Sequence, residues 1–257
     1  MDLTLQVYLI VLPAVFLAGL VDSIAGGGGL LSVPAYMAAG LPPHFVLGNN
    51  KFSSSFGTLC STLRYHRHGL IDLPLALLSA LVALAGSFLG TSAVLLLRPD
   101  FLRYLLLVLI PLAAVLILSN RSFGREDRSQ SRPRRHNYLI AAPAALLIGF
   151  YDGFFGPGTG TFLILVFTLA LKYDLVAANA NTKVVNLASN LAAVATFVVH
   201  GKVLFLLGVP AALAGIAGNL LGSKLVIRRG SRLIRPVFVL TLLLLFGKVL
   251  YDLIAAR

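Results

Sequence analysis

The chain has 257 residues, of which 58% are hydrophobic and 12% charged, with a mean hydropathy of +0.91 and a formal net charge of +12. A soluble domain carries about 25% charged residues, so this composition excludes an ordinary soluble protein and indicates an all-α polytopic membrane protein. The basic residues gather between apolar segments, as in the cytoplasmic loops of membrane proteins, which argues against nucleic acid as a partner. The single cysteine, Cys60, excludes an internal disulfide and a cysteine-based metal site.

The apolar residues form four blocks in each half of the chain. A spanning helix needs about 20 residues, and the first block of each half is longer than that and is interrupted by glycines. We therefore expect each of these two blocks to hold two helical pieces around an irregular centre. In chain order the blocks cover residues 5–41, 44–64, 71–97, 101–119, 138–171, 175–199, 203–227 and 236–254.

The two halves repeat one another at a nearly constant spacing. Asp22 matches Asp152 at an offset of 130 residues, and Lys51 matches Lys183 at an offset of 132. A series of matches at one spacing indicates an internal duplication. We therefore predict an N-terminal transmembrane repeat, a cytoplasmic basic linker and a C-terminal transmembrane repeat over residues 1–119, 120–137 and 138–257. Further matches at the offset of 132 pair His68 with His200, Gly86 with Gly218 and Gly90 with Gly222.

The distribution of charge favours opposite orientations for the two repeats. If every block crossed the membrane once, the basic segments 120–137 and 224–235 would lie on opposite sides, against the positive-inside rule. If each glycine-broken block enters and returns, both segments and the loop 64–70 face the cytoplasm, and both termini lie outside. We prefer this inverted repeat, a design found in many secondary transporters, and keep the parallel arrangement as the alternative.

Both broken blocks carry a glycine cluster where the chain should lie deep in the membrane. Non-helical backbone is tolerated there only when it is buried or lines an aqueous cavity, and the helix that follows offers free N–H groups to an anion. We therefore predict substrate binding at these clusters, with close helix packing as the alternative. The glycines of the two GxxxG pairs, 86/90 and 218/222, are assigned to packing. The predicted binding glycines are Gly26, Gly27, Gly28, Gly29, Gly156, Gly158 and Gly160.

Asp22 and Asp152 are the acidic residues that lie well inside apolar blocks. Burying a carboxylate in a membrane is costly, so such residues are functional candidates. An apolar environment favours the protonated carboxyl group, and we predict that both residues couple transport to protons. The alternative is that each of them caps the helix that follows the break.

Polar residues follow the breaks in both halves. Lys183, Asn186 and Asn190 share one helical face through their i, i+3 and i+7 spacing. Ammonium, amide and hydroxyl groups suit a small oxyanion. The alternative is that the lysines extend to the lipid headgroups while the polar residues hold helices together. The predicted substrate site therefore also contains Asn49, Lys51, Ser54, Asn181, Lys183, Asn186 and Asn190.

Five segments of the chain resemble the TauE/SafE family, also called the sulfite exporter or 4-toluene sulfonate uptake permease family. They read DSIAGGGGLL, GNNKFSSSFGT, GFYDGFFGPGTGTF, NTKVVNLASN and GSKLVIRRGSRLIRP. The first and third segments are similar to its YfcA-like branch in particular. The resemblance covers nearly the whole chain except the linker. It implies a bacterial inner-membrane transporter of sulfite, sulfonates or related sulfur anions, coupled to protons.

We therefore predict a secondary transporter, multi-pass in the cell inner membrane, that moves a small sulfur-containing oxyanion. The chain shows no ATP-binding motif and no catalytic constellation, and we predict no enzymatic activity, no cofactor and no metal. A passive anion or proton channel is the first alternative, and an intramembrane enzyme or scaffold is the second. The predicted partners are the anionic substrate and the lipid bilayer, without nucleic acid, and a homo-oligomer stays open.

Overall fold

The computed structural model of the protein describes residues 3–96, 124, 126–131 and 133–255. Every element in that part of the chain is a helix, as the composition predicts. The apolar block 101–119 and part of the linker lie outside the described residues. The helices are α1 (Leu5–Ala25), α2 (Gly29–Ala38), α3 (Pro43–Arg67), α4 (Leu73–Leu96), η1 (Ser129–Ser131), α6 (Arg134–Phe154), α7 (Thr159–Leu165), η2 (Val166–Ala170), α8 (Leu175–Val199), α9 (Phe205–Arg229) and α10 (Ser231–Ala255).

Five of these helices are long and apolar enough to cross a membrane: α1, α4, α8, α9 and the part of α10 over Ser231–Tyr251. Large apolar side chains on them stay exposed, among them Leu81 at 69% and Leu213 at 64%. Exposed leucines at this density suit contact with lipid rather than water. The structure therefore confirms the predicted all-α polytopic membrane protein.

The two long apolar blocks are each split into two helices, as the glycine clusters predict. The first block forms α1 and α2 around a break at 26–28, and the second forms α6 and α7 around a break at 155–158. Gly26 ends α1 in the left-handed conformation with φ 76°, and its N–H donates to the Asp22 carbonyl at 2.8 Å. A residue with a β-carbon is strained at that φ, so glycine suits this helix end.

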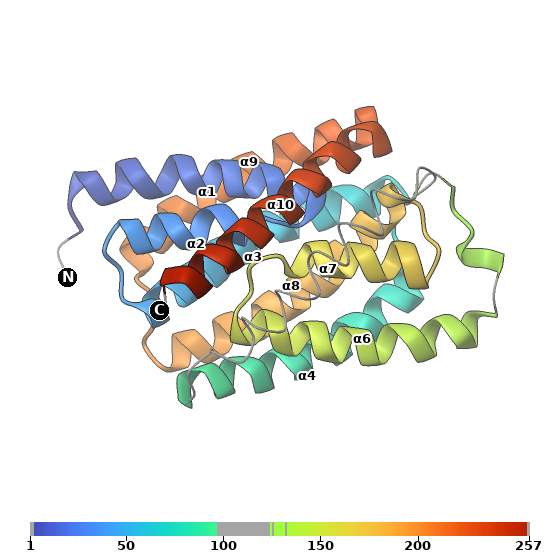
Figure 1. The fold of residues 1–257 in the computed structure, drawn as a ribbon, viewed down its shortest axis with the longest axis horizontal. Helices are drawn as coiled ribbons and strands as arrows, with labels where there is room; N and C mark the ends of the chain where they lie inside the picture. Colours follow the sequence, from blue (N-terminus) through green and yellow to red (C-terminus); the bar gives the residue numbers. More distant parts are fainter. Residues whose placement is uncertain (1–2, 97–123, 125, 132, 256–257) are drawn as a thin grey trace.

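The two broken blocks enter the molecule from opposite ends (Figure 1). Helix α1 begins at the end where the N-terminus lies, whereas α6 begins at the opposite end, next to the linker. Helix α1 packs along α9, α6 packs along α4, and α3 and α8 pack together between these pairs. This antiparallel course is what an inverted repeat requires, although the duplication itself stays a prediction.

The GxxxG pairs form the packing faces assigned to them. A β-carbon at Gly86 would lie 2.9 Å from the Phe150 backbone nitrogen in α6. A β-carbon at Gly218 would lie 2.9 Å from the Leu20 backbone nitrogen in α1. Real β-carbons do not approach backbone so closely, so these glycines let the helix pairs α4–α6 and α9–α1 come into backbone contact.

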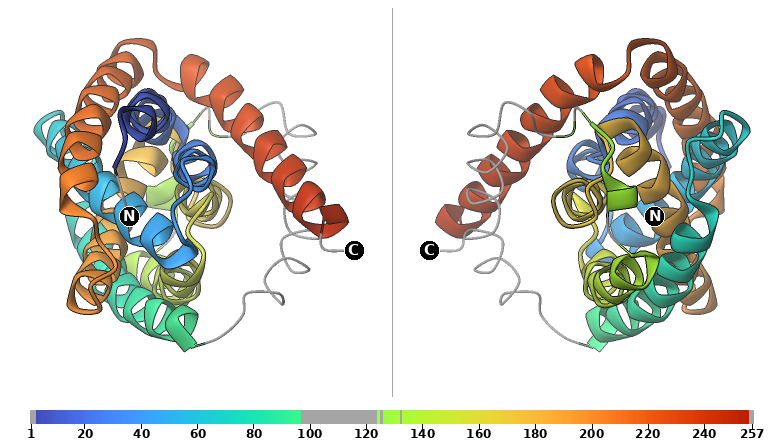
Figure 2. Two further views of the ribbon diagram at one scale, coloured as in Figure 1. Left: turned by 90° about the vertical axis from the view of Figure 1, so that its left-hand side faces the viewer. Right: turned by 90° about the vertical axis from the view of Figure 1, so that its right-hand side faces the viewer.

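The basic segment 224–235 is not an open loop. Helix α9 extends to Arg229 and α10 starts at Ser231, so only Gly230 separates them. Arginine is a good helix former, and Gly230 with φ 58° makes the sharp corner. This corner, the α3–α4 turn and the described part of the linker lie at one end of the molecule, and both chain ends lie toward the other (Figure 1). Figure 2 shows α10 running obliquely across one side of the bundle.

Candidate functional site

The two helix breaks meet in the interior of the protein. The Thr161 backbone N–H donates to the Gly26 carbonyl at 3.2 Å, and the Thr161 hydroxyl donates to the Ala25 carbonyl at 3.1 Å. A β-carbon at Gly160 would lie 2.5 Å from Gly26 Cα, and one at Gly29 would lie 3.2 Å from Pro157 Cα. Glycines in both clusters therefore allow the two helix breaks to come into backbone contact.

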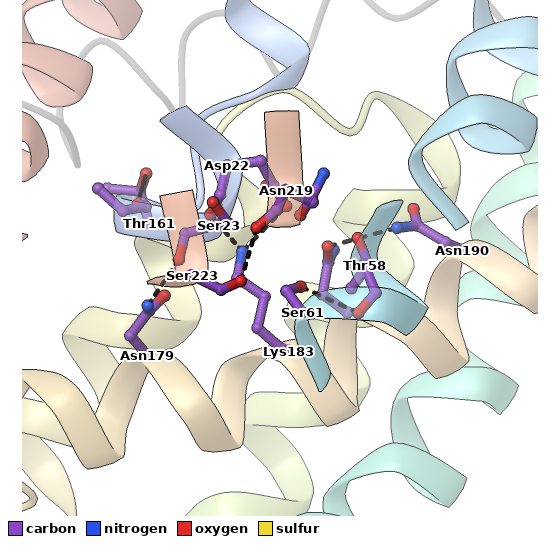
Figure 3. Close-up of polar contacts among 12 residues, drawn as sticks. Asp22, Ser23, Thr58, Ser61, Thr161, Asn179, Lys183, Asn190, Asn219 and Ser223 are labelled. Carbon is purple, nitrogen blue, oxygen red and sulfur yellow. Dashed lines mark hydrogen bonds and ion pairs between the residues drawn. The ribbon is translucent and has the colours of Figure 1, made fainter. Parts of the chain in front are cut away.

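The last carbonyl groups of α1 accept hydrogen bonds from side chains of other helices, as is common where a helix ends. The Ser23 carbonyl accepts hydrogen bonds from the Tyr65 hydroxyl and the Asn179 amide, each at 2.8 Å. The Lys183 ammonium group donates to the Asp22 carbonyl. Figure 3 shows Asn179 and Lys183 reaching from α8 toward this helix end. The break is thereby tied to α3 and α8.

The first buried ion pair joins Lys183 to Asp22. The Lys183 Nζ lies 2.9 Å from Asp22 Oδ2, and the two side chains are 0% and 16% exposed. Because the same ammonium group also binds the Asp22 carbonyl, it lies at the negative end of the α1 helix dipole. Lys183 therefore holds both the carboxylate and the C-terminus of α1.

The second buried ion pair joins Lys51 to Asp152. The Lys51 Nζ lies 2.6 Å from Asp152 Oδ1, and the two side chains are 3% and 2% exposed. Lys51 also donates to Asn190 Oδ1 at 3.0 Å, and the Ser189 hydroxyl donates to Asp152 Oδ2 at 2.6 Å. A buried pair is stable only when its other lone pairs and protons find partners, and α8 supplies both of them here.

The ion pairs are crossed between the two predicted repeats, since each lysine pairs with the aspartate of the other half. This geometry includes neither helix capping by the aspartates nor extension of the lysines to the headgroups, whereas Asn190 and Ser189 do join α8 to α3 and α6. The N-caps of α2 and α7 are Gly28 and Gly158, and neither helix has a side-chain cap. Both lysines are buried, so they do not extend to headgroups.

A small cavity lies between the two breaks and the two central helices α3 and α8. Its volume is about 20 Å³, which holds about one water molecule. An anion of four heavy atoms needs more room, so the structure shows a closed site. The cavity is lined by Asp22, Gly26, Gly29, Asn50, Lys51, Ser54, Asp152, Gly156, Gly158, Thr159, Gly160, Asn186 and Asn190.

Most of the predicted site residues line this cavity, and five do not. Gly27 and Gly28 face Thr241 and Ala18 respectively, and Lys183 lies beside Asp22 away from the lining. The Asn49 amide donates to the Phe45 carbonyl one turn back along α3 at 2.8 Å. The fifth residue outside the cavity is Asn181.

Asn181 lies instead in a second, larger cavity of about 610 Å³ near the α3–α4 turn. Its Oδ1 accepts a hydrogen bond from the Asp72 backbone N–H at 2.9 Å. The Tyr173 hydroxyl donates to Asp72 Oδ2 at 2.7 Å. Burial raises the pKa of the Tyr173 phenol well above its usual value, so it keeps the proton that it donates. Asn181 therefore ties α8 to this turn.

Two cavity residues were missed by the sequence analysis, Asn50 and Thr159. The Ser32 hydroxyl donates to Asn50 Oδ1 at 2.5 Å, which joins α2 to α3. Asn50 and Ser54 are four residues apart and so share a helix face. Because Ser54 was already a predicted site residue, this shared face was the available signal for Asn50. No comparable signal marks Thr159.

Relatives of this chain are named as membrane transporters. The "Probable membrane transporter protein YfcA" of Escherichia coli K12 is 36% identical over 236 residues, which are 92% of this chain and 87% of that protein. A "Probable membrane transporter protein" of Haemophilus influenzae is 34% identical over 252 residues, 98% of each chain. "ORF9" of a Sinorhizobium species, named in the same way, is 35% identical over 252 residues, 98% of this chain and 95% of that protein. No solved structure matches the chain with significance.

The family comparison agrees with these relatives and with the five segments that carry the resemblance. The model of "Sulfite exporter TauE/SafE" matches residues 11–249, nearly the whole chain. The names of the family and of the relatives denote membrane transporters and not enzymes. The protein is a membrane transporter that belongs to the TauE/SafE family.

Proposed function

We propose that the protein is a secondary transporter that moves a small sulfur oxyanion, sulfite or an organosulfonate, together with a proton across the bacterial inner membrane. The observation that carries the proposal is the pair of crossed ion pairs beside a polar cavity. The family supports the class of substrate through its name, sulfite exporter. The residues around the cavity support a negatively charged substrate and the coupling of its transport to protons.

The charges beside the cavity support coupling to protons. Two ammonium groups, of Lys51 and Lys183, face two carboxylates, of Asp22 and Asp152, so the four ionised side chains sum to zero. An added monoanion would leave an uncompensated negative charge in a buried site, which is costly. One proton on either carboxylate removes that charge. The arrangement therefore favours the uptake of one proton with each negative charge of the substrate.

The lining of the cavity supports an oxyanion. Lys51 supplies an ammonium group, Asn50 and Asn186 supply amide groups, and Ser54 supplies a hydroxyl group, whereas the Thr159 hydroxyl donates to the Gly156 carbonyl at 2.7 Å. Such donors satisfy several acceptor oxygens at once. Lys51 is the lysine that lines the cavity, so we assign anion binding to Lys51 and an anchoring role to Lys183. The substrate displaces the Asp152 carboxylate from Lys51, and one proton on Asp22 or Asp152 compensates the added negative charge.

The closed cavity supports a carrier over a channel. Because its volume of about 20 Å³ does not accommodate the substrate, the broken helix pairs α1–α2 and α6–α7 must separate before the anion enters. Their tips are joined at the Gly26–Thr161 contact, one main-chain hydrogen bond between the halves. Movement of one repeat against the other around a central site is the way inverted-repeat transporters alternate access.

The experiment is a flux screen with purified protein in proteoliposomes, with and without a pH gradient. Sulfite, sulfate, thiosulfate, sulfoacetate, taurine and carboxylates are the test solutes, and empty liposomes are the control. We expect uptake of sulfite or a sulfonate that a pH gradient drives, and counterflow when unlabelled substrate is loaded inside. Flux without counterflow would instead show a passive channel, and no flux of any solute would contradict the transporter proposal.

We also propose that the end carrying the basic segments faces the cytoplasm, so that both termini lie outside. The arginines of the α9–α10 corner and the linker support this orientation through the positive-inside rule. In a Cys60→Ala background, Gln130→Cys should resist a membrane-impermeant thiol reagent in intact cells, and His200→Cys should react. Both positions are exposed in the structure. The reverse pattern would place the basic segments outside.

A further inference from the structure

Three arginines line a groove at the corner between α9 and α10. Arg228, Arg229 and Arg232, together with Leu233, surround a cavity of about 580 Å³. All three arginine side chains are exposed, and none has an acidic partner within the described part of the chain. Surface arginines of membrane proteins without acidic partners are candidates for binding anionic groups.

The fold brings the three guanidinium groups together through the one-residue turn at Gly230. The Gly230 N–H donates to the Val226 carbonyl at 2.7 Å, which closes α9, and its carbonyl accepts from the Leu233 N–H at 3.1 Å, which opens α10. Arg229 and Arg232 therefore lie on the two sides of the corner. The N-terminus of α10 adds a partial positive charge at the same place.

The groove lies where two membrane spans end. Helices α9 and α10 are both candidate spans, and their corner is at one extreme of the molecule (Figure 1). Below it, exposed leucines continue on both helices, with Leu221 43% and Leu240 54% exposed. A cationic groove above an apolar surface matches a lipid, which carries an anionic headgroup on acyl chains. A free inorganic anion has no apolar part that could pack against the leucines.

We propose that this groove binds the phosphate headgroup of an anionic phospholipid. Guanidinium groups bind phosphate oxygens in a bidentate manner, and the acyl chains of the same lipid lie along the exposed leucines. The site is separate from the central cavity, since none of the groove residues lines that cavity. Lipid binding therefore does not rest on the proposed transport function. The lipid would stabilise the sharp corner that holds α10 against the bundle.

The test compares lipid binding by the full chain and by variants in detergent micelles. Bound phosphatidylglycerol and phosphatidylcholine are counted by native mass spectrometry, and the thermal unfolding midpoint is followed as either lipid or sodium phosphate is added. The variant is Arg228→Gln/Arg229→Gln/Arg232→Gln. The matched control, Arg67→Gln/Arg128→Gln/Arg135→Gln, removes the same charge from exposed arginines at the same end. Arg232→Gln alone is the second variant if the triple variant does not fold.

We expect the wild type and the control to bind phosphatidylglycerol and to unfold at a higher temperature with it, with little response to phosphatidylcholine. Each groove arginine contributes about five-fold to the affinity, so the triple variant should bind about a hundred-fold more weakly and Arg232→Gln about five-fold more weakly. An equal loss in the control, equal binding of phosphatidylcholine, or an equal shift with sodium phosphate alone would each overturn the proposal.

Discussion

The two buried lysines hold matching positions in the predicted repeats, yet their surroundings differ. Lys51 lines the cavity and binds a carboxylate, Asp152, that is 2% exposed and held by a serine. Lys183 is outside the cavity and binds a carboxylate, Asp22, that is 16% exposed. Two ion pairs of the same composition therefore suit different tasks. In the proposed function the first pair is assigned to anion binding, whereas the second holds the end of α1 and leaves its carboxylate partly exposed.

The difference originates in α3 and α8. Ser189 and Asn190 of α8 support the Lys51–Asp152 pair. At the offset of 132, the corresponding residues of α3 are Gly57 and Thr58. Gly57 has no side chain, and the Thr58 hydroxyl is buried without a hydrogen-bond partner within the described residues. The lesson is that two ion pairs at matching positions of the predicted repeats differ through the neighbours of the charges, while the charges themselves stay the same.

The largest expected effect comes from removing one lysine. Lys51→Met leaves Asp152 buried with only the Ser189 hydroxyl, and loss of one partner of a buried pair costs about 3–5 kcal/mol. Lys183→Met should cost less, because Asp22 is 16% exposed and its charge is less fully buried than that of Asp152. The free energy of unfolding in detergent measures both, and the flux assay should show no uptake by Lys51→Met.

The double variant Lys51→Met/Asp152→Leu is the control for this prediction. Removing both charges together leaves no unpaired ion, so stability should return nearly to the wild-type value while transport stays lost. A larger loss of stability for Lys183→Met than for Lys51→Met would contradict the distinction between the two pairs.

The second prediction separates the carboxylates by their dependence on pH. Asparagine keeps the shape of aspartate but does not titrate, so Asp22→Asn should still exchange substrate and lose pH-driven accumulation. With one proton per anion, a gradient of one pH unit supports up to about ten-fold accumulation, equivalent to about 1.36 kcal/mol. Uptake into proteoliposomes at imposed pH gradients measures this ratio.

Asp152→Asn sharpens the same comparison. It leaves Lys51 without its carboxylate, so a bound anion should raise the unfolding midpoint of this variant more than that of wild type or Asp22→Asn. Wild-type pH dependence in both variants would exclude the proton role and leave the carboxylates as structural groups.

The third prediction concerns the serine that is present beside one pair alone. Ser189→Ala removes a hydrogen bond to a carboxylate and should destabilise the protein by about 1.5–3 kcal/mol. The control is Ser79→Ala, since the Ser79 hydroxyl donates at 2.8 Å to the Leu75 carbonyl within α4. That variant should cost at most about 1 kcal/mol. Equal losses of unfolding free energy would show that Ser189 does not support the ion pair.

The smallest effect is expected from the amides. Asn190→Ala removes the second partner of Lys51 and should weaken the apparent affinity for the anion by about 1 kcal/mol, or about five-fold. Asn49→Ala should leave that affinity unchanged, because Asn49 is outside the cavity. The substrate concentration for half-maximal uptake measures both variants. A weaker affinity in Asn49→Ala alone would show that the anion binds outside the described cavity.

Much of the fold follows from local properties of the chain. Apolar runs of spanning length predict the membrane helices, and glycines within them predict the breaks, because backbone freedom and the exclusion of water act over a few residues. The sequence predicted the ends of the helices less accurately. Arginines in 224–235 suggested a loop, whereas they continue both helices up to Gly230.

The sequence by itself determined the class of protein, the position of the two breaks and the four charged residues at its centre. Only the tertiary structure decided that Lys51 pairs with Asp152 and Lys183 with Asp22. Periodicity places residues on a face of one helix, and partners on other helices depend on how those helices pack. Asn49 and Asn181 match in the sequence, yet neither lines the central cavity, because Asn49 donates to the Phe45 carbonyl of its own helix and Asn181 accepts from the Asp72 N–H of the α3–α4 turn.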